Sequence, residues 1–334
     1  MIITRTPFRI SFFGGGTDYP VWYEKNGGAV LSAAINKYCY ITCRRLSPFF
    51  NFNYRLRYNK IEETKSIHEI EHPSVRECLS FINFDRRLEM QHNTDIPGKS
   101  GLGSSSAFTV GLLNALYALQ GREVHKKQLA LDAIHVEQER IKENVGSQDQ
   151  TIAAFGGFRQ ISFGGEQKFD VKSVPIGDSR KEELLKHLML FFTGYQRTAS
   201  EIAGEQIKNT PQKGAELTRM HAMVDEACGI LINERRDLTD FGKLLHETWL
   251  LKKGLSSRIS TVAIDTLYDA ARAAGATGGK ILGAGGGGFM LLFAPPEAHA
   301  EIKEKLKPLI HVPFKFEELG SKVIYQMPES KLGY

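Results

Sequence analysis

The segment from Pro97 to Ala107, PGKSGLGSSSA, constrains this chain most, because it places glycines and a run of serines directly before an apolar stretch at 108–119. Glycine lets backbone N–H groups approach an anion closely, and a helix N-terminus presents unpaired donors with a partial positive charge. The segment therefore predicts a phosphate-binding loop that opens a helix. A serine cap after a glycine turn is the alternative, but three consecutive serines exceed what one cap needs. The residues expected to hold phosphates are Pro97, Gly98, Lys99, Ser100, Gly101, Leu102, Gly103, Ser104, Ser105 and Ser106.

This loop differs from the Walker pattern, which ends in Gly-Lys-Ser/Thr after a strand. Here Lys99 comes before the last two glycines of the segment. A distinct kind of phosphate loop is therefore predicted.

Composition bounds the class of protein. A chain of 334 residues with 42% hydrophobic and 24% charged residues is typical of a soluble globular protein with about two domains. The net charge of +5 is spread along the chain, which disfavours a nucleic-acid surface and suits small anionic substrates. The sequence shows no signal-peptide core and no membrane-length apolar run. Its four cysteines lack metal-ligand spacing, so we expect reduced thiols, a cytoplasmic location and no membrane partner.

Strand-like and helix-like segments are mixed along the chain, which predicts an α+β protein. The pattern weakens and charge rises near residues 170–185, so we expect one domain at 1–180 and a second at 181–334. Residues 2–6, 9–13, 29–35 and 38–44 read as separate short strands.

A helix predicted over about 126–144 carries a carboxylate in an apolar stripe. On a helical wheel Glu137 falls among alanines and isoleucines, whereas Glu139 and Glu143 fall on the opposite, solvated side. A buried carboxylate needs a partner. A metal ion and a buried Arg or Lys are equally good partners for Glu137 at this point.

Other side chains also lie in conspicuous places. Arg9 sits in an apolar strand before a glycine turn and needs an anionic partner. Asp18, at the end of that turn, could hold ligand hydroxyls or bond its own loop, and Asp149 could cap a helix or face a cleft as a base. The stretch 275–288 holds eight glycines, which indicates either tight turns or a backbone held against a ligand.

Together these segments resemble the GHMP kinase superfamily, which includes galactokinase, homoserine kinase and mevalonate kinase. Residues 7–19 (PFRISFFGGGTDY), 97–107 and 283–288 (GAGGGG) match its three motifs in order. The resemblance implies a two-domain α+β fold. Its N-terminal domain should be ribosomal-protein-like with a left-handed βαβ crossover, and its C-terminal domain ferredoxin-like, with ATP between them.

The resemblance also implies residue roles for phosphoryl transfer from ATP with Mg²⁺. Ser105 and Glu137 match the metal ligands, Asp149 matches the catalytic aspartate, and Arg9 matches the arginine beside it. Substrate is expected at the first and third motifs, namely Gly15, Gly16, Thr17, Asp18, Gly285, Gly286 and Gly287.

The first motif narrows the choice of sugar that accepts the phosphoryl group. Gly14-Gly15-Gly16 replaces the Gly-Glu-His of galactokinase, whose Glu and His side chains help to bind the sugar, so galactose is disfavoured. The run from Phe12 to Tyr38 and the segment 193–199 resemble the D-glycero-D-manno-heptose 7-phosphate kinase branch, which phosphorylates the anomeric hydroxyl. Such a sugar phosphate needs a cationic pocket. The candidates for this cationic pocket are Arg197, Lys252, Lys253, Arg258 and Lys280.

Two other functions remain open. The chain could be a fucokinase-like or galactokinase-like enzyme that acts on a free sugar, or a non-catalytic sugar-binding regulator. We expect it to be a monomer or homodimer.

Overall fold

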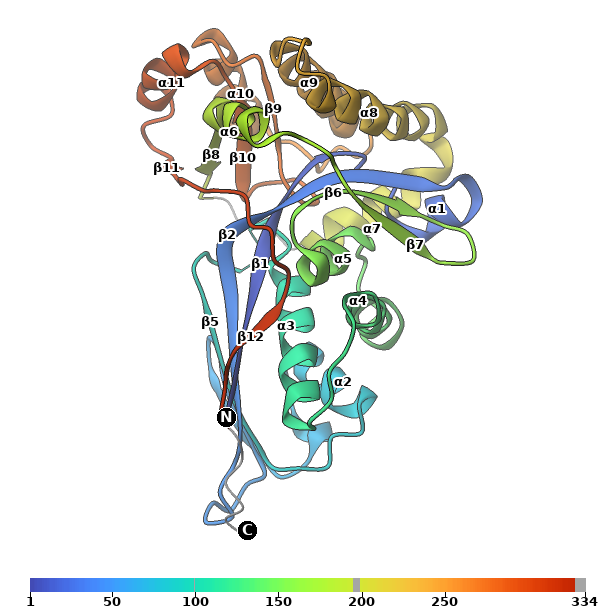
Figure 1. The fold of residues 1–334 in the computed structure, drawn as a ribbon, viewed down its shortest axis with the longest axis vertical. Coiled ribbons are helices and arrows are strands. Elements are labelled where there is room, and N and C mark those ends of the chain that lie inside the picture. The colour runs from blue at the N-terminus through green and yellow to red at the C-terminus, as the bar shows by residue number, and fades with distance from the viewer. Residues whose placement is uncertain (99, 195–198, 328–334) are drawn as a thin grey trace.

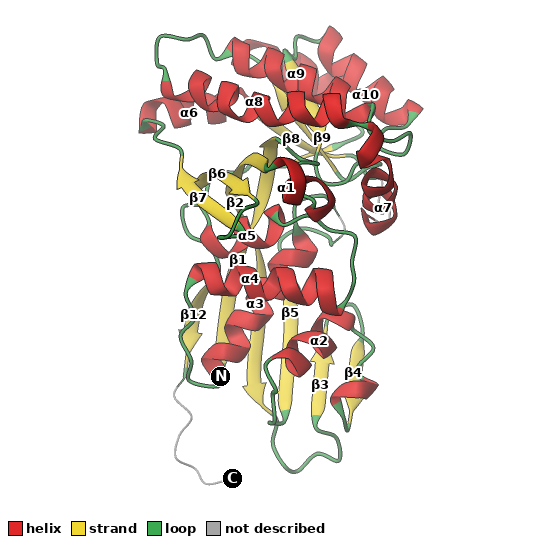
Figure 2. Cartoon of the chain, turned by 90° about the vertical axis from the view of Figure 1, so that its right-hand side faces the viewer, coloured by secondary structure: helices red, strands yellow, loops and turns green. Residues whose placement is uncertain are grey.

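The computed structural model describes residues 1–98, 100–194 and 199–327, and it contains two sheets stacked end to end (Figures 1 and 2). The larger sheet lies in the half of the molecule that holds the N-terminus. Its main path runs β12 (Lys322–Gln326), β1 (Ile2–Phe13), β2 (Gly28–Arg45), β5 (Leu88–Thr94), β3 (Tyr54–Arg57) and β4 (Ile61–Thr64), while β6 (Phe158–Phe163) pairs with β2 and β7 (Phe169–Ser173) pairs with β6.

Two strands are longer than the sequence indicated. The segments 2–6 and 9–13 form the single strand β1, and 29–35 and 38–44 form the single strand β2. The prediction of separate short strands was therefore wrong. The interruption at Pro7 survives only as a register shift between Pro7 and Phe8, because a proline loses one ladder donor without ending the strand.

Helices cover one face of this sheet (Figure 1). Helix α3 is buried almost all round, as its uniformly apolar sequence requires, and it packs on β1 and β2. A π-helical turn at Val136–Arg140 continues α4. The helices of this half are α1 (Pro20–Asn26), α2 (Pro73–Phe81), α3 (Ser104–Leu119), α4 (Lys126–His135) and α5 (Gln148–Phe155), with a 3₁₀ turn at Ile67–Glu69.

The second sheet is antiparallel throughout, in the order β11 (Ile310–His311), β8 (Leu188–Phe192), β10 (Phe289–Phe293), β9 (Gly278–Ile281). Helices separate β8 from β9 and β10 from β11, which gives the ferredoxin-like strand order that was expected. These helices are α7 (Ala199–Asn209), α8 (Gly214–Ile232), α9 (Thr239–Lys253), α10 (Val262–Ala273) and α11 (His299–Lys305), with 3₁₀ turns at Thr210–Gln212 and Pro296–Ala298.

The chain passes between the two halves more than once. Helix α6 (Asp178–His187) spans the predicted boundary at 180, and the last strand, β12, returns to pair with β1. The division into 1–180 and 181–334 stays a prediction. The site described below lies where the two halves meet.

Candidate active site

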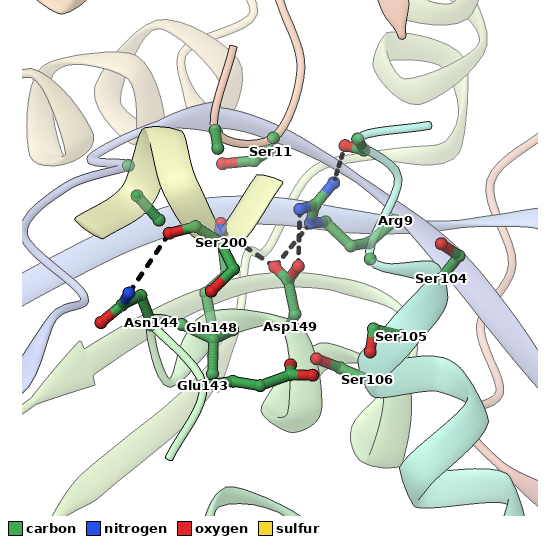
Figure 3. A pocket seen from close by; sticks show the side chains of 18 of the residues that line it. Arg9, Ser11, Ser104, Ser105, Ser106, Glu143, Asn144, Gln148, Asp149 and Ser200 are labelled. Carbon is green, nitrogen blue, oxygen red and sulfur yellow. Dashed lines mark hydrogen bonds and ion pairs between the residues drawn. The ribbon is translucent and has the colours of Figure 1, made fainter. Parts of the chain in front are cut away.

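A cavity of about 420 Å³ lies where the first motif, the glycine-serine loop and the start of α5 converge (Figure 3). Helix α9 and the segment after β9 complete its wall from the second half of the molecule. Thirteen residues singled out from the sequence line it, namely Arg9, Gly15, Gly16, Asp18, Gly98, Gly101, Gly103, Ser104, Ser105, Ser106, Asp149, Lys252 and Lys280.

Arg9 and Asp149 form a two-pronged ion pair at the centre of the cavity (Figure 3). The Nε and Nη2 atoms of Arg9 donate to the two carboxylate oxygens of Asp149 at 2.8 and 2.7 Å. The third donor, Nη1, binds the carbonyl of Gly101 at 2.6 Å. A planar guanidinium suits this fork geometry. Asp149 lies in the first turn of α5 and lines the cavity, as one of its two sequence interpretations held.

The glycine-serine loop approaches this carboxylate closely. Gly103 has φ +75°, and a methyl group on it would lie 3.3 Å from Oδ2 of Asp149. Helix α3 begins at the next residue, Ser104, so the N–H groups of its first turn open beside Asp149. An anion held by this helix start would therefore lie next to the carboxylate.

The third motif packs against the second through the backbone. A methyl group on Gly101 would lie 2.5 Å from the carbonyl oxygen of Leu282, and one on Gly283 would lie 2.6 Å from Cα of Gly101. Phe289 N–H also binds the carbonyl of Ser100 at 3.1 Å. The glycines thus permit two loops from different halves of the molecule to touch.

Glu137 is fully buried, as the helical wheel predicted, but it lies behind the cavity wall. Its Oε2 accepts hydrogen bonds from Ser106 at 2.8 Å and from Gln150, while Oε1 has no partner among the described residues. Burial raises the pKa of Glu137 to about 7. Within the described residues neither Arg nor Lys forms an ion pair with Glu137, so these residues give no support to a buried ion pair there.

The first motif holds its own conformation through Thr17 and Asp18. The Thr17 Oγ1 lies 2.8 Å from the carbonyl oxygens of both Gly14 and Ala29, which share its one proton, and it accepts from Ala29 N–H at 3.1 Å, so this side chain is occupied within the turn. Asp18 accepts from Gly16 N–H at 2.9 Å and also lines the cavity. The pKa of Asp18 is raised, mainly by burial and further by the negative charge of the nearby Asp149.

Several predicted residues lie outside the cavity wall. Lys99 and Arg197 lie outside the described residues. Among the residues that the structure describes, the buried hydroxyl of Ser100 has no hydrogen-bond partner. A methyl group on Gly285 would meet Ile259 rather than open space. The residues absent from the wall are Pro97, Ser100, Leu102, Thr17, Glu137, Gly285, Gly286 and Gly287.

The wall also contains residues that the sequence did not single out. Glu143 lines the cavity and points toward Ser106 in Figure 3, so its assignment to the solvated face was wrong. The wheel assumed a regular helix to residue 144, whereas the helix ends in a π turn at Arg140 and Lys142 has φ +62°. At the other end, His72 stacks on Phe108 with ring centroids 4.8 Å apart, and His92 meets Phe108 at 5.0 Å.

Three further findings concern metal-binding groups, membrane spans and cysteines. No group of three or more His, Cys, Asp or Glu side chains that could hold a metal ion occurs in the described residues. Across 1–98, 100–194 and 199–327, every helix is too short or too polar to cross a membrane. All four cysteines are buried and free, as expected.

Comparison with known proteins places this two-part α+β architecture in a known family. The family model named GHMP kinases N terminal domain matches residues 73–157, and GHMP kinases C terminal matches residues 227–308. D-glycero-alpha-D-manno-heptose 7-phosphate kinase of Campylobacter jejuni is 32% identical over 318 residues, which cover 88% of this chain and 90% of that protein. Mevalonate kinase of Pyrococcus horikoshii is 28% identical over 70% of each chain.

Comparison with solved structures also finds sugar kinases. The crystal structure of a D-glycero-D-manno-heptose 1-phosphate kinase from Bacteroides thetaiotaomicron superposes with a TM-score of 0.79 at 21% identity, over 98% of this chain and 100% of that one. The chain belongs to the GHMP kinase family. Its expected fold class, two domains of that family in a mixed α+β architecture, is confirmed.

Proposed function

We propose that this chain is an ATP-dependent sugar kinase that phosphorylates the anomeric hydroxyl of D-glycero-D-manno-heptose 7-phosphate. The product would be the 1,7-bisphosphate, a precursor of nucleotide-activated heptose for surface glycans. The observation that carries the kinase part is the approach of Gly103 to Asp149, which sets the start of α3 beside a carboxylate held by Arg9. The heptose part rests on the 32% identity to the Campylobacter jejuni kinase.

In this mechanism the chain mainly positions reactants and balances charge. Backbone N–H groups at residues 103–106 bind the phosphates of ATP and take up charge that develops during transfer. Asp149 orients the acceptor hydroxyl and receives its proton, while Arg9 fixes the carboxylate through two hydrogen bonds.

Glu137 and the neighbouring serines of the loop provide oxygen ligands that fit a divalent cation. Within the described part of the chain, Oε1 of Glu137 is a buried carboxylate oxygen without a hydrogen-bond partner, and carboxylate and hydroxyl oxygens suit Mg²⁺. Ser105 and Glu137 would hold the ion as the family resemblance implies, with Ser106 already bonded to Glu137 at 2.8 Å. When bound, Mg²⁺ neutralises charge on the phosphate oxygens.

The nucleobase would lie at the aromatic end of the cavity, against His72, His92 and Phe108. Burial lowers the pKa of His72, and it lowers that of His92 to about 4, so both rings are neutral near pH 7. A neutral aromatic wall suits a flat, uncharged base.

The remaining predictions accompany this proposal. We infer that the units 1–180 and 181–334 act as ATP-binding and C-terminal kinase domains. The chain would work in the cytoplasm as a monomer or homodimer, and four free thiols support a reducing compartment.

An assay with Mg²⁺, ATP and D-glycero-D-manno-heptose 7-phosphate tests the proposal. We expect ADP release that depends on the sugar, and a new phosphate on the anomeric carbon by ³¹P NMR. L-fucose, D-galactose and the unphosphorylated heptose are the comparison acceptors. If a free sugar is used at least as efficiently as the heptose 7-phosphate, the heptose assignment is wrong and a fucokinase-like or galactokinase-like role is supported. No turnover with any acceptor would instead support the regulator.

A further inference from the structure

Two buried lysines line the cavity without a carboxylate partner. Lys252, on α9, is 5% exposed, and Lys280, on β9, is 1% exposed. Neither forms an ion pair within 4 Å among the described residues. Burial and, less strongly, the charge of Arg9 lower the pKa of both amines. The more distant Asp18 raises the pKa of both, and Asp149 raises that of Lys252. A buried ammonium group without a counter-ion is unfavourable, so two of them in one wall indicate that the ligand supplies the negative charge.

Both amines retain hydrogen-bond donors. Lys252 gives two of its three N–H groups to the carbonyls of Ile281 and Gly283, and Lys280 gives one to the carbonyl of Phe12 at 2.8 Å. One donor therefore remains on Lys252 and two on Lys280. These backbone contacts hold the amines in place before any ligand arrives.

A third polar group points to the same place. The hydroxyl of Ser11 is buried, lines the cavity and has no hydrogen-bond partner among the described residues. Ser11 directly precedes Phe12, whose carbonyl holds Lys280. It also lies beside Gly15, where a methyl group would be 3.7 Å from Oγ of Ser11. An unused buried hydroxyl next to two such amines is what a site for a polar anion requires.

The other described basic candidates have different partners. Lys253 pairs with Asp265 at 3.1 Å, and Arg258 pairs with Glu205 at 2.9 Å. Neither residue lines the cavity. The structure therefore separates Lys252 and Lys280 from their neighbours, which a sequence cannot do because Lys252 and Lys253 are adjacent.

We propose that Lys252 and Lys280, assisted by Ser11, bind the phosphomonoester that the acceptor sugar already carries, and thereby select phosphorylated over free sugars. This inference rests on the proposed sugar-kinase function. The phosphates of ATP belong at the start of α3, whereas Lys280 is fastened to the first motif beside the acceptor residues Gly15 and Asp18.

Electrostatics supports the assignment. Burial, with smaller contributions from Arg9, lowers the pKa of Lys252 to about 7, and burial lowers that of Lys280 as well. A phosphate dianion in contact with both amines favours their charged forms. Binding of a phosphorylated sugar should therefore take up protons near neutral pH.

The test compares Lys252→Met and Lys280→Met with the matched control Lys253→Met. Methionine keeps the length of the side chain and removes the charge, a replacement that buried sites tolerate well. For heptose 7-phosphate we expect kcat/KM to fall about tenfold to a hundredfold in each cavity variant, the range of one lost charge-assisted hydrogen bond. For the unphosphorylated heptose the fall should stay below about threefold, and the control should match wild type with both sugars.

An equal fall with both sugars would overturn the inference, because the lysines would then serve the transferred phosphoryl group or the fold. An unchanged kcat/KM with heptose 7-phosphate would also overturn it. Should a methionine variant fail to fold, Ser11→Ala and Lys252→Gln provide the same comparison at lower structural cost.

Failure of the proposed function is recognised separately, because wild-type chain would then phosphorylate neither heptose. Calorimetric titration with inorganic phosphate, with a non-hydrolysable ATP analogue and Mg²⁺ bound, decides the inference in that case. A loss of about tenfold or more in phosphate affinity in Lys252→Met and Lys280→Met supports the anion site, and equal affinity in wild type and both variants rejects it.

Discussion

We expect that removing both members of the Arg9–Asp149 ion pair restores part of the stability that each single substitution loses, but restores no activity. A double-mutant cycle can measure both effects. The side chain of Arg9 is 5% exposed and that of Asp149 is 18% exposed. Asp149→Asn leaves a buried guanidinium without its counter-ion, which costs about 3 to 5 kcal/mol of unfolding free energy. Arg9→Met leaves a carboxylate that still reaches water, so we expect a smaller loss of about 1 to 3 kcal/mol.

The double variant removes both charges, so no ion remains buried without a partner. We therefore expect its loss of stability to be about 2 kcal/mol smaller than the sum of the two single losses. Urea unfolding at pH 7 measures the three differences, with an unchanged denaturant slope as the control for two-state behaviour.

Activity should show no such recovery. Removal of a general base lowers kcat by about 10² to 10⁴, and the double variant lacks that base as well. Strictly additive stability losses would refute the proposed coupling between the two charges. An Asp149→Asn variant that keeps a tenth or more of wild-type kcat would refute the role of Asp149 in proton transfer.

Three further predictions follow from the loop and from Glu137. Gly101→Ala should raise KM for ATP at least about tenfold and destabilise the chain, because Gly101 has φ +85° and the new methyl group would lie 2.5 Å from the Leu282 carbonyl oxygen. Gly98→Ala should behave as wild type in the same assays, because open space surrounds Gly98. The pKa of Glu137 is raised to about 7 and its carboxyl must lose a proton to hold a cation, so apparent Mg²⁺ affinity should rise between pH 6 and 8 in a kinetic titration and lose that dependence in Glu137→Gln. Without metal, the folded state binds this proton more tightly than the unfolded state between pH 4.5 and about 7. The unfolding free energy should therefore fall as pH rises through that window, by about 1.4 kcal/mol per pH unit. Denaturant titrations of Glu137→Gln should lack this contribution.

The sequence predicted the parts of the site that lie in local patterns. The glycine-serine loop, the burial of Glu137 and the exposure of Glu139 all follow from short-range spacing, and the structure confirms these features. The aromatic wall of His72, His92 and Phe108 could not be found this way. Its members come from the start of α2, from β5 and from α3, and only the packing of these helices on the sheet brings them together.

Two other errors have different physical origins. The interpretation of 275–288 as tight turns or ligand-holding backbone missed strand β9, because β9 begins with Gly278 and Gly279, residues that disfavour strands. A methyl group on Gly279 would collide with the carbonyl of Leu291 on β10, so close packing requires glycine there. Glu143 was misplaced because a π turn adds a residue that the helical wheel cannot foresee.

The density of glycine in the third motif has a cause other than ligand binding. Gly283 packs on Gly101, a methyl group on Gly288 would collide with the carbonyl of Ser100, and Phe289 N–H binds that same carbonyl. Gly101 in turn accepts a hydrogen bond from Arg9, which holds Asp149. These contacts form one continuous path from the second sheet to the candidate base, and most of it is backbone. Because a side chain at Gly101, Gly283 or Gly288 would push the two loops apart, their glycines fix where the phosphate loop lies relative to Asp149, whether or not they touch a ligand themselves.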